Sequence, residues 1–180
     1  MPRLRVRLLV FAVFLLIFPF FLRRRPRVER RITILAPPEM IFPMVNDLRN
    51  WPLWTAWSER DEIAFSYGDV VEGAGAIQRW RTAKSDGVLR IIRSRANRRI
   101  DYTLEMDGGK YHLLGRVDFI PDGACTRIVW KCVWPSARNP YMRYIDLAFR
   151  WLMGRDFSRG LARLQTAVER KRPLSTERVV

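Results

Sequence analysis

Apolar and polar residues alternate through most of the middle of the chain. Over residues 99–106, Ile100, Tyr102, Leu104 and Met106 fall on one face, and charged or hydroxyl side chains fall on the other. A period of two is typical of a half-buried β-strand. Similar patterns predict further strands over residues 30–35, 63–67, 76–81, 88–95, 110–120 and 126–134.

Turn residues separate these strands, as in Asp107-Gly108-Gly109. Consecutive strands joined by tight turns pair antiparallel. Helical spacing predicts two short helices, over residues 38–45 and 49–54, and a long final helix capped by Asn139. The final helix carries an apolar stripe of Tyr144, Leu147, Trp151, Phe157, Leu161, Leu164 and Val168. We therefore expect an α+β fold in which this helix covers one antiparallel sheet of about six to seven strands.

The N-terminal segment has a different pattern. Residues 8–22 are apolar on all sides and carry no charge. A full membrane span usually needs about 17–25 residues, so we favour a monotopic or signal-anchor helix. A cleaved signal peptide and a buried core helix are the alternatives, although no small-residue cleavage site follows the run.

Charge strengthens the membrane interpretation. The net charge is +15, and residues 1–31 hold nine arginines against Glu29 alone. Such a cluster beside an apolar run suits a membrane with anionic headgroups. We expect no nucleic acid partner, because zinc-finger spacing, RNA-recognition signatures and long basic blocks are missing from the rest of the sequence. Six arginines follow the run and three precede it, which places the domain on the cytoplasmic side.

These patterns divide the chain into three parts. Residues 1–29 form a basic-flanked membrane anchor, residues 30–172 form one domain, and residues 173–180 form a polar tail. The oligomeric state does not follow from the sequence.

Several motifs within residues 30–170 are familiar. They are Ile34-Leu35-Ala36-Pro37-Pro38-Glu39, Val45-Asn46-Asp47-Leu48 leading into Trp51-Pro52-x-Trp54-x-x-Trp57, Gly73-Ala74-Gly75-Ala76, Asn97-Arg98-Arg99-Ile100-Asp101-Tyr102, Gly123 through Trp130, and Asp156-Phe157-x-x-Gly160-Leu161. Together with the element order, they resemble the START-like superfamily, also called SRPBCC, in its polyketide cyclase/dehydrase and lipid-transport branch.

The resemblance implies a helix-grip fold, in which a curved antiparallel sheet wraps the C-terminal helix and leaves a cavity between them. Members of the superfamily bind lipids, sterols, polyketides or other apolar molecules, and a minority are enzymes. The branch has no shared catalytic motif that transfers to this sequence.

The polar residues do not form a recognisable catalytic set. The single histidine, His112, shares a strand face with Arg116 and Asp118 and is expected to face solvent. Asp101 and Glu105 are also expected to face outward. The two cysteines, Cys125 and Cys132, are too far apart on one strand for a disulfide, and they are too few for a metal site. We assign no catalytic residue, metal or cofactor.

Aromatic residues on the predicted inner faces are the candidate ligand-binding set. A packed core is the alternative role for the same side chains. Arg93 shares the parity of Leu89 and Ile91, so it either faces inward, where an anionic ligand group could pair with it, or reaches solvent at the strand end. The candidates are Trp80, Arg93, Tyr102, Phe119, Trp130, Trp134 and Trp151.

Three functions remain open. The first is membrane-tethered binding or transport of an apolar small molecule or lipid. The second is an enzyme of the polyketide cyclase/dehydratase type, which needs a polar group inside the cavity. The third is a basic scaffold that holds no ligand. We expect a binder rather than an enzyme.

Overall fold

The computed structural model describes residues 2–22, 25–56, 63–83, 85–136 and 139–171. Arg23, Arg24, Trp57 and the predicted polar tail lie outside the described residues. The described elements are, in chain order, α1 (Pro2–Phe21), β1 (Arg27–Ile34), α2 (Pro38–Asn46), η1 (Leu48–Asn50), α3 (Trp51–Trp54), β2 (Ala64–Tyr67), β3 (Ile77–Arg81), β4 (Asp86–Arg95), β5 (Arg99–Met106), β6 (Tyr111–Asp122), β7 (Cys125–Val133), η3 (Pro140–Met142) and α4 (Arg143–Lys171).

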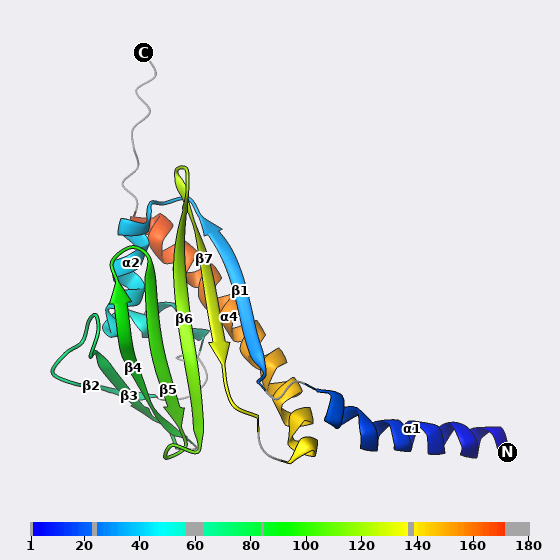
Figure 1. Ribbon diagram of the computed structural model, residues 1–180. Coiled ribbons are helices and arrows are strands. Elements are labelled where there is room, and N and C mark those ends of the chain that lie inside the picture. The colour runs from blue at the N-terminus through cyan, green and yellow to red at the C-terminus, as the bar shows by residue number, and fades with distance from the viewer. Residues whose placement is uncertain (1, 23–24, 57–62, 84, 137–138, 172–180) are drawn as a thin grey trace.

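The strands form one sheet in the order β1-β7-β6-β5-β4-β3-β2. Every neighbouring pair is antiparallel. Figure 1 shows the curved sheet with α4 lying along one face, which is the helix-grip arrangement. The α+β fold and the antiparallel pairing expected from the sequence are confirmed.

Strand positions follow the alternation closely, and small shifts occur at the turns. β5 occupies Arg99–Met106, as predicted, and the turn after it places Asp107, Gly108 and Gly109 at positive φ. β4 begins at Asp86, within the predicted turn, because that turn is closed earlier by hydrogen bonds between Thr82 and Ser85.

An aromatic cluster joins the sheet to the helices. The ring of Trp130 on β7 stacks on Phe157 of α4, with 3.8 Å between ring centroids and 7° between ring planes. The indole Nε1 of Trp130 donates to the hydroxyl of Tyr102 at 2.7 Å. Trp51 and Trp54 complete the cluster from α3. All five side chains are buried, so the cluster fixes α4 and α3 against the sheet.

Glycines allow the closest approaches. Gly160 of α4 faces Trp130, and a Cβ on Gly160 would lie 3.1 Å from the Trp130 ring. A Cβ on Gly154 would lie 2.3 Å from the guanidinium of Arg30, which crosses from β1. The two glycines within the predicted final helix therefore mark close packing.

α1 projects away from the sheet, and its contacts with η3 and α4 lie toward its C-terminal end (Figure 1). Arg143 Nη1 donates to the carbonyl of Pro19 at 2.7 Å and to those of Phe20 and Leu22 at 3.3 Å. The hydroxyl of Tyr144 donates to the carbonyl of Leu15 at 2.6 Å. None of the helices in the described part of the chain combines the length and apolar character that a membrane span requires.

Candidate functional site

A cavity of about 280 Å³ lies between α3, the inner face of β2–β5 and the first half of α4. Its surface is mainly apolar, with a few polar groups on the walls. The lining residues are Trp51, Pro52, Thr55, Ile63, Phe65, Gln78, Trp80, Thr82, Ser85, Leu104, Met106, Phe149, Leu152, Met153 and Asp156. Apolar walls with few convergent polar groups are typical of small-molecule sites, whose volumes run from about 300 to 1,000 Å³.

The wall supplied by α3 is held rigidly. Trp51 is buried, and its Nε1 donates to the carbonyl of Val45 at 2.8 Å. The Thr55 hydroxyl donates to the carbonyl of Trp51 at 2.8 Å. Pro52 lies within the first two positions of α3, where it removes no helical hydrogen bond. This side of the cavity is therefore formed before any ligand enters.

The sheet wall depends on a pairing of Trp80 with a glycine. Trp80 on β3 lies directly across from Gly87 on β4, and a Cβ on Gly87 would lie 2.0 Å from the Trp80 ring. Leu104 and Met106 continue this wall along β5. The absent side chain at Gly87 lets the indole of Trp80 lie over the neighbouring strand.

Two buried polar side chains reach this cavity from opposite sides. The amide of Gln78 donates to the carbonyl of Leu48 at 3.2 Å and to the hydroxyl of Tyr67 at 3.4 Å. Asp156 comes from α4 and is 5% exposed. Among the described lining residues, Asp156 supplies the carboxylate. The cavity can therefore orient a polar group on an otherwise apolar ligand.

Among the predicted site residues, Trp80 lines the cavity. Tyr102 and Trp130 face inward, as expected, but they lie in the packed aromatic cluster. Trp134 is buried and donates from Nε1 to Asp146 Oδ1 at 3.0 Å. Phe119 packs against Phe42 with 5.4 Å between ring centroids. Whether any of them binds ligand stays a prediction.

The inward orientation considered for Arg93 is wrong. Ile91 pairs with Tyr102, but Arg93 pairs with Asp101, so Ile92 is an extra residue in β4. A β-bulge of this kind reverses the face of every later residue in the strand. The side chain of Arg93 is exposed.

The inward orientation expected for Trp151 is also wrong, since it is 63% exposed. The buried face of α4 runs through Phe157, Leu161, Leu164 and Val168. Extending that face backward in steps of four residues reaches Met153 and Phe149, whose side chains do line the cavity. Trp151 lies between them on the opposite side of the helix. Leu147 of the same predicted stripe is exposed as well.

The sequence interpretation missed most of the lining. Gln78 shares the parity of Trp80 on β3, so the alternation alone could have identified it as an inward polar residue. Asp156 precedes the buried Phe157, and helical spacing places the two residues on adjacent faces. No periodic signal identified the α3 residues, because their position depends on tertiary packing.

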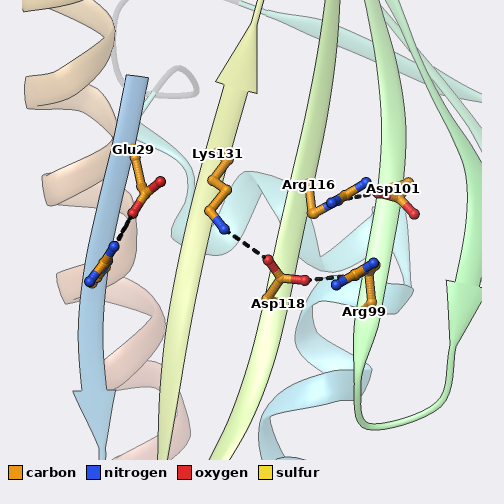
Figure 2. Close-up of polar contacts among 7 residues, drawn as sticks. Glu29, Arg99, Asp101, Arg116, Asp118 and Lys131 are labelled. Carbon is orange, nitrogen blue, oxygen red and sulfur yellow. Dashed lines mark hydrogen bonds and ion pairs between the residues drawn. The ribbon is translucent and has the colours of Figure 1, made fainter. Parts of the chain in front are cut away.

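The ionisable residues considered for catalysis lie on the opposite face of the sheet. Arg99 Nε is 2.7 Å from Asp118 Oδ1, and Arg116 Nε is 2.6 Å from Asp101 Oδ1. Figure 2 shows these pairs on the sheet face turned away from the helices, with Lys131 also reaching Asp118. The hydrogen bond to Asp101 raises the pKa of Arg116. The outward orientation expected for these residues is confirmed.

His112 also faces solvent, as expected. Its side chain is 62% exposed, and its Nδ1 lies 3.8 Å from Glu105 Oε1. Neither residue reaches the cavity.

The sequence of residues 25–169 matches the profile of the family described as polyketide cyclase/dehydrase and lipid transport. The chain belongs to this family. The resemblance seen in the sequence motifs is thus confirmed, and family membership suggests ligand binding or cyclase-type activity. No functionally curated protein matches the sequence.

Solved structures share the family fold at low identity. The protein TTHA0849 from Thermus thermophilus superposes with a TM-score of 0.63 at 19% identity, over 81% of this chain and 98% of that one. MLL2253 from Mesorhizobium loti superposes with a TM-score of 0.61 at 10% identity, over 82% of this chain and 99% of that one. DynU16, described as a putative protein in the dynemicin biosynthetic locus, superposes with a TM-score of 0.58 at 12% identity, over 82% of this chain and 48% of the DynU16 chain. These likenesses support the fold.

Proposed function

We propose that the domain binds a small, largely apolar molecule in the cavity between α3, the sheet and α4. The observation that carries this proposal is the apolar cavity of about 280 Å³ with Gln78 and Asp156 on its walls. That volume lies near the lower limit of small-molecule sites, so it favours a ring system or one short acyl chain over a complete phospholipid.

Filling the cavity tests this proposal. Met106 lines it at the end of β5, and Met106→Trp would occupy part of its volume. We expect the neutral fluorescent probe N-phenyl-1-naphthylamine to bind the natural protein and to bind Met106→Trp at least about tenfold more weakly. Ile120→Trp is the matched control, because Ile120 is 43% exposed on β6 and is not among the lining residues. Equal probe binding by all three proteins would refute the proposal. Thermal melting verifies folding, and Met153→Phe provides a second filled variant.

The natural ligand can be sought directly. Organic extraction of the purified protein followed by mass spectrometry should recover an apolar compound from the natural protein and less of it from Met106→Trp. Recovery of a compound that is equally abundant in both preparations would contradict cavity binding.

An enzyme of the cyclase or dehydratase type is the second candidate, and Asp156 is the observation that favours it. A carboxylate on an apolar wall can act as a general acid or base. If the protein is an enzyme, the compound recovered from Asp156→Asn should differ from that of the natural protein by the atoms lost in the reaction, such as one water. Identical compounds would favour simple binding.

We further propose that α1 holds the domain at a membrane. Thirteen large apolar side chains of α1 are exposed: Leu4, Val6, Leu8, Leu9, Val10, Phe11, Val13, Phe14, Leu15, Leu16, Ile17, Phe20 and Phe21. An apolar surface of this extent is unfavourable in water and requires a cover. The arginines on both flanks suit anionic lipid.

Cell fractionation tests the tether. Leu9 and Val13 are exposed, so Leu9→Asp combined with Val13→Asp should move the full chain from the membrane fraction to the supernatant. Leu114→Asp combined with Ile120→Asp is the control, because both residues are exposed on the outer face of β6. Release of both variants, or of neither, would contradict the tether.

We also propose that the domain faces the cytoplasm, because six arginines follow the apolar run and three precede it. Protease added outside intact cells should then leave the domain uncut.

A further inference from the structure

A second groove, of about 690 Å³, opens where α1, β1 and the first turns of α4 meet. It is distinct from the cavity, and it shares none of the cavity's lining residues. Its walls carry Phe21, Leu22, Pro26, Arg27, Glu29, Arg31, Arg143, Asp146, Leu147 and Arg150.

The groove is positively charged. Four arginines face two carboxylates, which leaves two positive charges. Within the groove, Glu29 pairs with Arg31, accepting from its Nε at 2.8 Å, whereas Asp146 accepts from Trp134 and Ser136. The hydrogen bond from Arg31 lowers the pKa of Glu29, so this carboxylate stays ionised and paired. Among the described residues, no carboxylate lies within 4 Å of Arg27 or Arg150.

Arg143 adds an independent observation. It is 7% exposed, and it donates to three main-chain carbonyls at the end of α1. Its Nε is buried without a hydrogen-bond partner among the described residues. The end of a helix supplies only about half an elementary negative charge. A buried guanidinium whose positive charge is only partly neutralised is stabilised by a bound anion.

The rim of the groove is apolar. Phe21 is 80% exposed and Leu147 is 42% exposed. Beyond Leu147, the same part of α4 presents Ile145 and Trp151, which are 60% and 63% exposed. Arg155 lies over the Trp151 ring, 4.7 Å from its centroid, and tryptophan is favoured at membrane interfaces. An anion that carries acyl chains fits this combination better than a free anion or a nucleic acid does.

We propose that this groove binds the phosphate of an anionic membrane lipid, with Arg27, Arg143 and Arg150 on the phosphate and the acyl chains along Phe21 and Leu147. This inference rests on the membrane tether proposed above. It adds a defined headgroup site to an otherwise nonspecific apolar anchor.

Vesicle binding by the purified full chain tests the site. The two vesicle types are phosphatidylcholine alone and an equal mixture of phosphatidylcholine and phosphatidylglycerol. We expect the natural protein to bind both types and to prefer the mixture. The groove variant, Arg27→Gln with Arg150→Gln, should lose roughly 20-fold in affinity for the mixture and little for phosphatidylcholine.

The control variant, Arg79→Gln with Arg90→Gln, removes the same charge from two exposed positions on β3 and β4. It should retain most of the preference for the mixture. Equal losses in the two variants would show that the whole basic surface acts rather than the groove, and would overturn the proposal.

The remaining outcomes separate the two proposals. Binding to both vesicle types without preference would overturn the headgroup site and leave the tether standing. Failure to bind either type would overturn both. If inorganic phosphate abolishes the preference for the phosphatidylglycerol mixture, and chloride at the same ionic strength does not, the groove is assigned to free phosphate. Duplex DNA binding that disappears in the groove variant would assign it to nucleic acid.

Discussion

Tyr102 illustrates how one residue on β5 organises its surroundings. It lies directly across from Gly115 on β6, and its hydroxyl accepts a hydrogen bond from Trp130. A Cβ on Gly115 would lie 1.9 Å from the Tyr102 ring. The pair allows a large ring to lie flat across two strands beneath the helix.

Gly115→Ala should therefore destabilise the fold. The added methyl group forces Tyr102 out of its position, and overpacking of this kind costs about 1–3 kcal/mol. Urea denaturation measures the change. Leu114→Ala is the control, because the neighbouring side chain is 56% exposed. A Gly115→Ala protein as stable as the control would show that the Tyr102 contact is not limiting.

Cys132 gives a prediction that depends on pH. Burial raises the pKa of its thiol from 9.0 to about 12. The thiol should resist N-ethylmaleimide at about pH 8 in the folded protein, whereas the half-buried Cys125 should react, because the thiolate is the nucleophile. Peptide mass mapping distinguishes the two residues. Equal labelling rates would contradict the prediction.

The same shift affects stability at alkaline pH. The unfolded thiol ionises near pH 9, whereas the folded thiol keeps its proton until about pH 12. The contribution of the buried Cys132 thiol to the free energy of unfolding is therefore fully present below pH 9 and is lost as the pH rises toward 12. Cys132→Ala should lose less stability than the natural protein over this interval.

At the scale of elements, α4 has two halves with different environments. From Phe157 onward its apolar face is buried against the aromatic cluster, whereas Ile145 and Trp151 are exposed near its start. The sequence pattern suggested one continuous stripe. The offset between Trp151 and Phe157 is six residues, which does not return to the same helix face, so the two groups cannot share one environment.

Substitution should separate the two halves. Phe157→Ala removes the ring stacked on Trp130 and should cost about 3–5 kcal/mol in free energy of unfolding. Trp151→Ala should change it by less than about 0.5 kcal/mol in the absence of membranes. Urea denaturation measures both. A large loss for Trp151→Ala would indicate that this residue packs against the domain.

Strands were more predictable than the helices that meet them. The period of two identified β5 and its inward residues, because each face of a half-buried strand has one environment. Alternation gave the wrong face for Arg93, because the bulge at Ile92 inserts a residue that the local sequence pattern does not reveal. The part of the cavity lining that α3 and α4 supply could not be predicted, because these helices converge from distant parts of the sequence.

At the scale of the whole molecule, the element order follows from the periodic pattern of the sequence, and the motifs within residues 30–170 indicated the family that the profile match over residues 25–169 shows. The placement of α1 does not follow from that pattern, because it depends on Arg143, which the sequence alone does not connect with residues 19–22. The same contact places the basic groove beside the exposed apolar helix.

Arg143→Met should loosen the junction between α1 and the domain. Three hydrogen bonds from a charged donor would be lost, so trypsin should cut after Arg27 roughly tenfold faster. Arg155→Met, which replaces an exposed arginine of the same helix, is the control. Unchanged cleavage in Arg143→Met would show that α1 is held by other contacts.

The contact of Arg143 with main-chain carbonyls has an evolutionary consequence. Every residue has such a carbonyl, so the junction places little demand on side-chain identity at Phe20 or Leu22. Mutations can accumulate along α1 without detaching it, provided that the helix and its apolar character persist. We expect this helix to diverge faster among close relatives than Arg143 does, and to be replaceable by an unrelated apolar helix.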